Sequence, residues 1–491
     1  MRLAAGLFLL AAWLAAAPQD GVDLDGLIDR ARSVPAEFAA DALIRLAQSD
    51  RVAKAKKPEL LEEAFRRATG AQQPLKKRAI PAVRTGAAAF LNRAFAQDLD
   101  ANSLQCRAVR GMLELNPRKA REMFTDIPRP APAKLTCDDA LVPDVSIYYE
   151  TLAEVAKSGF SAAEIEDDEP FKLLASYVAA LSSPTQVGPI ARLLASSPLK
   201  RPQLDALAMS FGGSLKNLSG DDRSFSQAIS RQGGAGQGIA SLAARCTEME
   251  ISSLPLLEAY RAFLVRHFTA NRCTDGGERG GIAFGVVAKD DTVEQDPARF
   301  FNESLRVDPI KPLGADEVQP AKLEGAAGQQ NSCDSQDCRR LVGLYRELIF
   351  DSRGLPYGPD KKATSEWQAK AKEYLGALAA WKEETGASTA DLFQQKCALY
   401  SEFANVVPNG PDRVAVLRAF LAFLSQNSVQ RENRAEWFLP VNSLVARVSL
   451  QRASLDELWR DMRGSADPLI ALYCELEELA PRSPGTRLSI F

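Results

Sequence analysis

The chain has 491 residues, of which 46% are hydrophobic and 25% are charged, and its formal net charge is -3 at pH 7. This is the composition of a globular protein with a sizeable core, and it leaves room for two to four domains or one elongated array. No basic stripe stands out along the chain, which argues against a nucleic-acid partner.

The N-terminus has the pattern of a secretory signal peptide, which we assign to residues 1–17. Arg2 supplies one positive charge, and an uncharged apolar run extends from it to Ala17. The run is shorter than the roughly 20 residues of a membrane span. Pro18 disfavours cleavage directly before it, so cleavage after Ala16 and retention as an anchor both stay open. We therefore expect an exported protein, periplasmic or extracellular, with no membrane span beyond this segment.

Residues 18–272 form a predicted N-terminal helical region. Apolar residues recur there at three- and four-residue steps, the period of a helix that packs on one face. Residues 117–128, PRKAREMFTDIP, resemble one helix of a tetratricopeptide or pentatricopeptide unit, although the pattern does not recur at a fixed spacing. The predicted helices of this region cover residues 36–49, 58–69, 80–97, 102–115, 141–157, 170–182 and 252–272.

Residues 231–246, RQGGAGQGIASLAARC, place three spaced glycines before a helix, as a phosphate-binding loop does. A dinucleotide loop needs a preceding strand and a last glycine, but the preceding stretch is polar and Ile239 occupies the last glycine position. A P-loop is excluded because no Gly-Lys-Ser/Thr follows. We therefore expect no cofactor, and we interpret the segment as a flexible glycine loop that leads into a helix at 239–246.

Three other groups of residues match part of a functional motif but lack the other residues that the motif needs. His267 is the only histidine and shares a helix face with aromatic residues, so we expect it in the core. Ser197 and Lys200 match the Ser-x-x-Lys of penicillin-recognising enzymes, whose two further motifs are missing. The acidic run 164–169 lacks the spaced ligands and central glycine of a calcium loop and predicts a solvated helix start. No metal site is expected, and the catalytic residues of any enzyme activity stay unknown.

Residues 273–336 interrupt the helical pattern. They are rich in Gly, Asp and Pro, and only a short helix near 299–306 is expected among them. Long segments of this kind inside a folded protein are connectors or functional loops. We interpret this one as a loop-rich connector, with a binding loop or lid as the alternative.

Residues 337–491 form the predicted C-terminal helical region. The helical period is clearest over 364–385, where Ser365 has the position of an N-cap in a capping box. Further helices are predicted to begin near Pro411, Ser454 and Asp467.

Eight cysteines follow the signal segment, and an even number in an exported chain favours disulfides. A zinc site is disfavoured because one pair alone is closely spaced and the chain has one histidine. We predict a bond between Cys106 and Cys137, because two helices and their link could return the chain to its starting point. Buried free thiols are the alternative. The disulfide candidates are Cys106, Cys137, Cys246, Cys273, Cys333, Cys338, Cys397 and Cys474.

Short links that contain proline or glycine join many of the predicted helices, and such links make neighbouring helices antiparallel. The predicted fold is all-α: an irregular α-solenoid or a multi-helix bundle of antiparallel helix pairs, interrupted by one long loop-rich segment. The predicted function is that of an exported, non-enzymatic helical scaffold or binding protein, whose partner is a protein or a cell-envelope component. The alternative is an all-helical carbohydrate-active enzyme that uses dispersed carboxylates.

Overall fold

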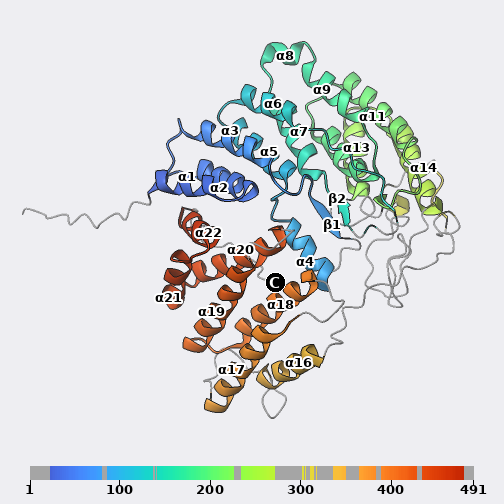
Figure 1. Cartoon of the computed structure of the whole chain (residues 1–491). Coiled ribbons are helices and arrows are strands. Elements are labelled where there is room, and N and C mark those ends of the chain that lie inside the picture. Colours follow the sequence, from blue (N-terminus) through green and yellow to red (C-terminus); the bar gives the residue numbers. More distant parts are fainter. Residues whose placement is uncertain are drawn as a thin grey trace, which may run out of the picture.

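The protein is mostly α-helical, as the sequence predicts (Figure 1). A computed structural model describes residues 23–79, 86–136, 139, 141–225, 234–270, 301–303, 305, 310–314, 317, 336–349, 364–382, 389–427 and 434–479. The predicted signal segment and most of the predicted connector 273–336 lie outside these residues.

Most helices of the N-terminal part pack chiefly on helices close to them in sequence. Thus α2 packs on α1 and α3, α5 packs on α3, α6 and α7, and α10 packs on α7 and α13. The bounds are α1 Leu24–Ser33, α2 Ala36–Gln48, α3 Lys57–Ala68, α4 Gly86–Phe95, α5 Ala101–Leu113, α6 Pro117–Asp126, α7 Ser146–Ser158, α8 Ala162–Glu166, α9 Glu169–Val178, the 3-10 helix η1 Pro184–Gln186, α10 Val187–Ser196, α11 Arg201–Leu215, α13 Ala235–Glu248 and α14 Leu254–Ala270.

A short antiparallel ribbon lies between the first helices and α7. It pairs β1, Lys77–Ala79, with β2, Leu141–Pro143, and Arg78 stands opposite Val142. The sequence predicts a helix from residue 141, which is wrong for these first residues. Pro143 has no N–H and disfavours a helical conformation in the residue before it, so α7 begins only at Ser146.

The C-terminal helices continue the same mode of packing. Successive helices contact each other from α18 to α22, and α16 packs on α17. Their bounds are α16 Gln336–Ile349, α17 Ser365–Ala380, α18 Thr389–Val406, α19 Pro411–Gln426, α20 Arg434–Leu450, α21 Arg452–Arg463 and α22 Pro468–Leu479.

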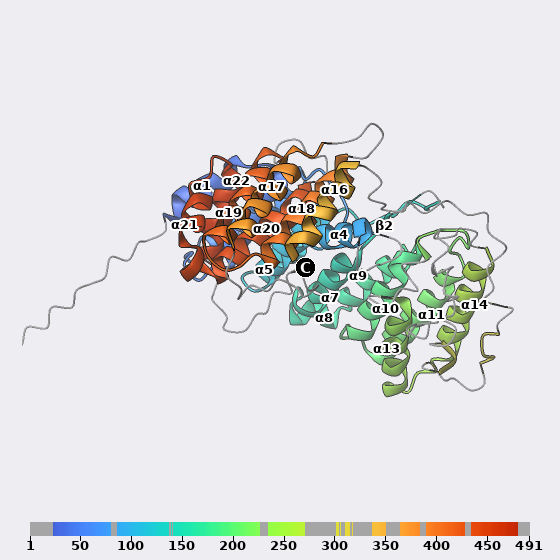
Figure 2. The ribbon, with the colours of Figure 1, turned by 90° about the horizontal axis from the view of Figure 1, so that it is seen from below.

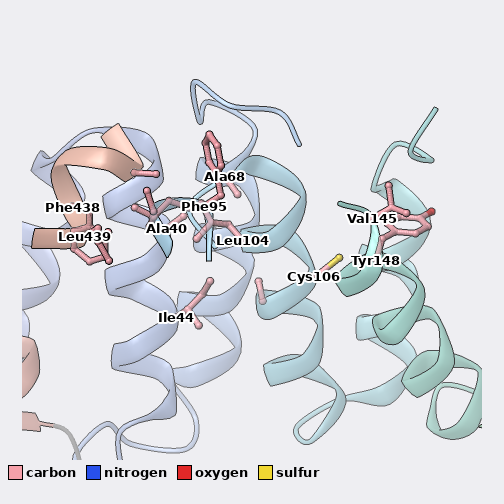
Figure 3. Packing of buried hydrophobic residues seen from close by; sticks show 14 of the residues in the cluster. Ala40, Ile44, Ala68, Phe95, Leu104, Cys106, Val145, Tyr148, Phe438 and Leu439 are labelled. Carbon is pink, nitrogen blue, oxygen red and sulfur yellow. The ribbon is translucent and has the colours of Figure 1, made fainter. Parts of the chain in front are cut away.

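The two ends of the described chain pack together. Figure 2 shows α16–α22 gathered with α1, α4 and α5, while α7–α14 form a separate group on the other side. Helix α22 contacts α1 and α2, and α20 contacts α4. Phe38 of α2 lies at ring-centroid distances of 5.6 Å from Phe438 and 6.2 Å from Tyr473. Figure 3 shows Phe438 and Leu439 beside Ala40 of α2, so residues from both ends share one core.

Helix starts fall close to the predicted residues, and the differences are local. Thr364, one residue before the predicted Ser365, caps α17, because its side chain accepts a hydrogen bond from the N–H of Trp367. Asp467 caps α22 as predicted, with its Oδ1 accepting from the N–H of Leu469 at 2.9 Å. Helix α21 begins at Arg452 rather than near Ser454 and has a kink at Leu455.

Candidate functional site: an arginine-lined pocket

A small pocket lies between α18, α19 and α20, and its volume of about 10 Å³ gives room for about one water molecule. Its walls come from side chains spaced three or four residues apart on each helix, which is the spacing of one helix face. The apolar wall residues are Ala404, Leu417, Phe420, Pro440 and Leu444, and the polar ones are Ser401, Ser443 and Arg447.

Arg447 is a buried cation in this wall, with a relative exposure of 8%. Its Nη2 donates a hydrogen bond to the carbonyl oxygen of Ala404 at 3.0 Å. Among the described residues it has no other hydrogen bond and no carboxylate within ion-pair distance. Burial, followed by the charge of Arg413, lowers the pKa of Arg447. The guanidinium stays protonated, because its ordinary pKa is above 12.

Arg413 of α19 is the second buried cation near the pocket, but its donors are used. Its Nε and Nη2 donate to the carbonyl oxygen of Val407 at 3.2 and 2.7 Å, and its Nη1 donates to Oδ1 of Asn409. Val407 directly follows α18, so this guanidinium satisfies carbonyl groups at the negative end of that helix. Arg413 therefore helps to cap the C-terminal end of α18, whereas Arg447 makes a single hydrogen bond to that helix.

The sequence of α20 explains why Arg447 faces the pocket. Pro440, Ser443, Leu444 and Arg447 stand at positions i, i+3, i+4 and i+7, so one stripe of the helix carries all four to the pocket. Pro440 has no N–H to complete the helical hydrogen-bond pattern, and the hydroxyl of Ser443 donates to the carbonyl oxygen of Leu439 at 2.8 Å. A proline inside a helical period and an arginine on an apolar face were the two signals available in the sequence, and neither was recognised.

This small pocket combines one positive charge with a mostly apolar wall. Arg447 supplies a fixed positive charge with spare N–H donors, and the surrounding wall is apolar. The wall contains no cysteine, histidine or carboxylate.

A second charged cluster lies where the two ends of the chain meet. Asp41 of α2 is 1% exposed, and its carboxylate contacts Arg45 at 2.9 Å and Arg107 at 2.6 Å. The hydroxyl of Tyr473 donates to the same carboxylate at 2.8 Å. Burial alone would raise the pKa of Asp41, but the two arginines outweigh it and the pKa is lowered. Every polar atom of this carboxylate is thus engaged, and the cluster joins α2, α5 and α22.

Asp100, the N-cap of α5, is a buried carboxyl group with a raised pKa. Burial raises its pKa to about 6, although its carboxylate accepts a hydrogen bond from the N–H of Ser103 at 3.0 Å. Asp98 lies nearby with a left-handed φ of 55° and is paired with Lys76 at 2.6 Å. Asp100 is only 3% exposed, which separates it from solutes.

The predicted disulfide between Cys106 and Cys137 is wrong for this structure, because Cys106 carries a free thiol. Cys106 faces the core from the middle of α5 and is fully buried, so the helical hairpin does not bring it to a surface link. Figure 3 shows it among the packed side chains near Tyr148. Cys246 and Cys474 are also free and buried, and Cys397 is buried in α18. Cys137, Cys273, Cys333 and the side chain of Cys338 lie outside the described residues.

The other sequence candidates do not form a common site. His267 is buried as predicted, stacked on Phe225, with Nδ1 2.8 Å from the carbonyl oxygen of Phe263. The Ser197 hydroxyl donates to the carbonyl oxygen of Leu193, while Lys200 pairs with Asp168 at 2.8 Å.

The acidic run 164–169 covers the end of α8 and the start of α9. Ser161 and Glu164 form a capping box, and Glu164 also pairs with Arg121 at 2.7 Å. These contacts, with Arg121 contributing most, lower the pKa of Glu164 to about 2. No group of three or more His, Cys, Asp or Glu side chains is placed to hold a metal ion within the part of the chain that the structure describes.

The glycine-rich stretch serves helix packing. Helix α13 already begins at Ala235, four residues before the predicted start, so Gly236 and Gly238 are helical. A Cβ atom at Gly238 would lie 2.7 Å from the carbonyl oxygen of Gly188 in α10. Gly238 therefore permits the close approach of α13 to α10.

Comparison with known proteins gives no relative: no family model, curated protein or solved structure matches the chain. Among the described helices, none is both long enough and apolar enough to cross a membrane.

Proposed function

We propose that the chain is an exported, non-enzymatic helical protein that binds a protein or another component of the cell envelope. The observation that carries this proposal is that most helices, from α1 to α14 and again from α16 to α22, pack on helices close to them in sequence. An irregular α-solenoid built this way offers a long continuous surface to a partner. The closure of α22 on α1 and α2 would fix the curvature of that surface.

The alternative, a carbohydrate-active enzyme, needs two carboxylates that a substrate can reach. Asp100 has the raised pKa of a general acid, but its burial beneath the N-terminus of α5 gives this alternative no support.

Photo-crosslinking in the native envelope tests the proposal. Met209 of α11 is 55% exposed and is a suitable position for a photo-reactive amino acid, with the buried Phe211 of the same helix as the control. We expect a specific adduct from position 209 and none from position 211. The adduct should appear in the envelope fraction, and it should disappear from that fraction when residues 1–17, the predicted export signal, are removed. Polysaccharide cleavage by the purified chain, without any adduct, would favour the enzyme.

A further inference from the structure

We propose that His267 makes the contact between α14 and the link 216–225 sensitive to acid, so that proton uptake by its imidazole separates the link from α14 while the other helices stay packed. The link 216–225 is the stretch that follows α11 and ends at Phe225. His267 is the only histidine in the chain, and it is fully buried. This inference goes beyond the proposed function and does not depend on it.

Three contacts hold the link on the C-terminal half of α14. Nη1 of Arg266 donates to three backbone carbonyl oxygens at the end of α11 and the start of the link, at 2.6 to 3.3 Å. Gly220 passes so close that a Cβ atom there would lie 2.9 Å from Cγ of Arg266. Phe225 stacks on the imidazole of His267, with ring centroids 4.8 Å apart and an angle of 22° between the planes. The imidazole is therefore part of the surface on which the link lies.

The surroundings of the imidazole favour its neutral form. Nδ1 lies 2.8 Å from the carbonyl oxygen of Phe263, which can only accept, so Nδ1 carries the proton of the neutral ring. Nε2 is buried and has no hydrogen-bond partner among the described residues. The rings of Phe225 and Phe263 lie against the imidazole. A second proton would place a cation and an unpaired N–H among apolar groups, which is unfavourable.

Neighbouring charges do not offset this burial. Burial lowers the pKa of His267, and the charge of Arg266 acts in the same direction. The backbone of Phe263 and Ser219 and the carboxylate of Asp222 act in the opposite direction, but they are outweighed. Asp222 lies on the link, and its Oδ1 already accepts two backbone N–H groups at 2.9 and 3.2 Å.

The other elements packed on α14 bring no compensating carboxylate to the imidazole. The buried residues of α11 and α13 are uncharged, and the one titratable group among them is the thiol of Cys246. Glu317 of the connector pairs with Arg261, nearly two turns earlier on α14, at 2.7 Å. Because the buried face of α11 is apolar, its packing on α14 does not change with pH.

Acid therefore favours the separated link. Once the link leaves α14, the imidazole meets water and regains its ordinary pKa of about 6.5. The pKa is lower in the closed structure, so the stabilising contribution of the neutral ring is complete above about pH 6.5 and is lost as the pH falls below it. In this window each pH unit multiplies the separated population by up to about ten.

Hydrogen exchange of the whole chain, measured by mass spectrometry at pH 7.5 and 5.0, tests this coupling. After correction for the intrinsic pH dependence of exchange, we expect the link and the end of α14 to exchange at least about fivefold faster at pH 5.0. Helices α2 and α3 should keep their protection. Proton NMR follows the imidazole directly, because a single histidine gives one set of ring signals, and its titration midpoint should lie below 6.5.

Two variants assign the effect to the imidazole. His267→Phe fills a similar space without a titratable group, and His267→Gln keeps a polar, uncharged side chain if phenylalanine disturbs the packing. Either folded variant should exchange at the same corrected rate at both pH values. Glu248→Gln, which removes an exposed carboxyl group of α13, is the control and should keep the wild-type response.

Three results would overturn the proposal. The first is an acid response that persists in a folded variant of His267 or is missing from the wild type. The second is equal acceleration along the whole chain, which would mean that acid unfolds the molecule as one unit. The third is a titration midpoint of the wild-type imidazole at or above 6.5, which decides the matter even if neither variant folds.

Discussion

At the scale of single residues, burial raises the pKa of a carboxyl group and nearby cations lower it, and the larger of the two effects differs between sites. Asp41 and Asp100 are both buried acids, yet the pKa of Asp41 is lowered and that of Asp100 is raised. Two arginines contact Asp41, whereas Asp100 accepts a hydrogen bond from the N–H of Ser103 and has no arginine in contact among the described residues. A helix N-terminus alone therefore does not offset the loss of water around a carboxylate.

Asp100→Asn should stabilise the protein in a pH-dependent way. The folded-state pKa of about 6 lies above the ordinary value of 3.8, so the free energy of unfolding of the wild type falls as pH rises between these values. Asparagine keeps the N-cap without the charge, and its advantage should reach up to about 3 kcal/mol at pH 7.5 and vanish near pH 4. Urea unfolding at both pH values measures this difference.

The thiols of Cys106 and Cys474 should react only when the protein unfolds. Burial raises the pKa of each to about 12, so little thiolate forms at neutral pH, and both side chains are inaccessible. Iodoacetamide should label both in denaturant and neither in the native protein, as read by peptide mass spectrometry. Ser196→Cys, at an exposed position, should label under native conditions. Native labelling of Cys106, or a disulfide-linked peptide that contains it, would contradict the structure.

At the scale of elements, the sequence predicts helices well because a helix needs local information only. The three- and four-residue period located α2, α3, α5 and α14 to within a few residues. The pocket was not predictable in this way, because it exists only when three helices meet in a particular register. For the same reason, the sequence did not predict that Gly238 permits close helix packing, because its neighbour Gly188 belongs to another helix.

Gly238→Ala should destabilise the protein even though alanine favours helices. The new Cβ would lie 2.7 Å from a backbone oxygen of α10, so α10 and α13 must move apart and lose packing. Gly376 of α17 is the matched control, because a Cβ there meets nothing within 4 Å. We expect Gly376→Ala to gain about 0.5–1 kcal/mol and Gly238→Ala to lose about 1–3 kcal/mol in chemical unfolding. A gain at both positions would show that α10 and α13 are not in close contact.

At the scale of the whole molecule, the first and last described helices pack on each other: α22 contacts α1 and α2. Tyr473 donates to Asp41 across 432 positions of sequence, and Arg30 of α1 pairs with Glu475 of α22 at 2.6 Å. No periodicity within a segment reveals such a contact, which is why the sequence predicts helical regions but not that their first and last helices share a core.

Tyr473→Phe should lower the free energy of unfolding more than Arg30→Ala, although each substitution removes one contact between α22 and the first two helices. The tyrosine loses a buried hydrogen bond to a charged group, about 1.5–3 kcal/mol, whereas the Arg30 side chain is 47% exposed and its pair contributes about 1 kcal/mol or less. Denaturant midpoints of the two variants give the comparison. An equal or reversed order would mean that Asp41 does not depend on Tyr473.

Removal of α22 should loosen the N-terminal helices in particular. A chain that stops before Pro468 leaves the faces of α1 and α2 that contact α22 open to water. Hydrogen exchange measured by mass spectrometry should quicken in α1 and α2, while α10 and α13, which pack on each other, keep their protection. Uniformly faster exchange along the chain would indicate that the molecule unfolds as one unit.

The contact between first and last helices also sets an order of events during synthesis. Ribosomes add about 5–20 residues per second, so roughly 400 residues separate the emergence of α2 from that of α22 by about 20–80 seconds. Throughout that interval Phe38 and its neighbours lack the aromatic partners that α20 and α22 supply. A nascent chain whose earliest helices cannot complete their core stays loosely folded, which is the state that a secretory translocon can thread. In the export that we propose, the same closure that stabilises the finished molecule would thus delay its folding until translocation is complete.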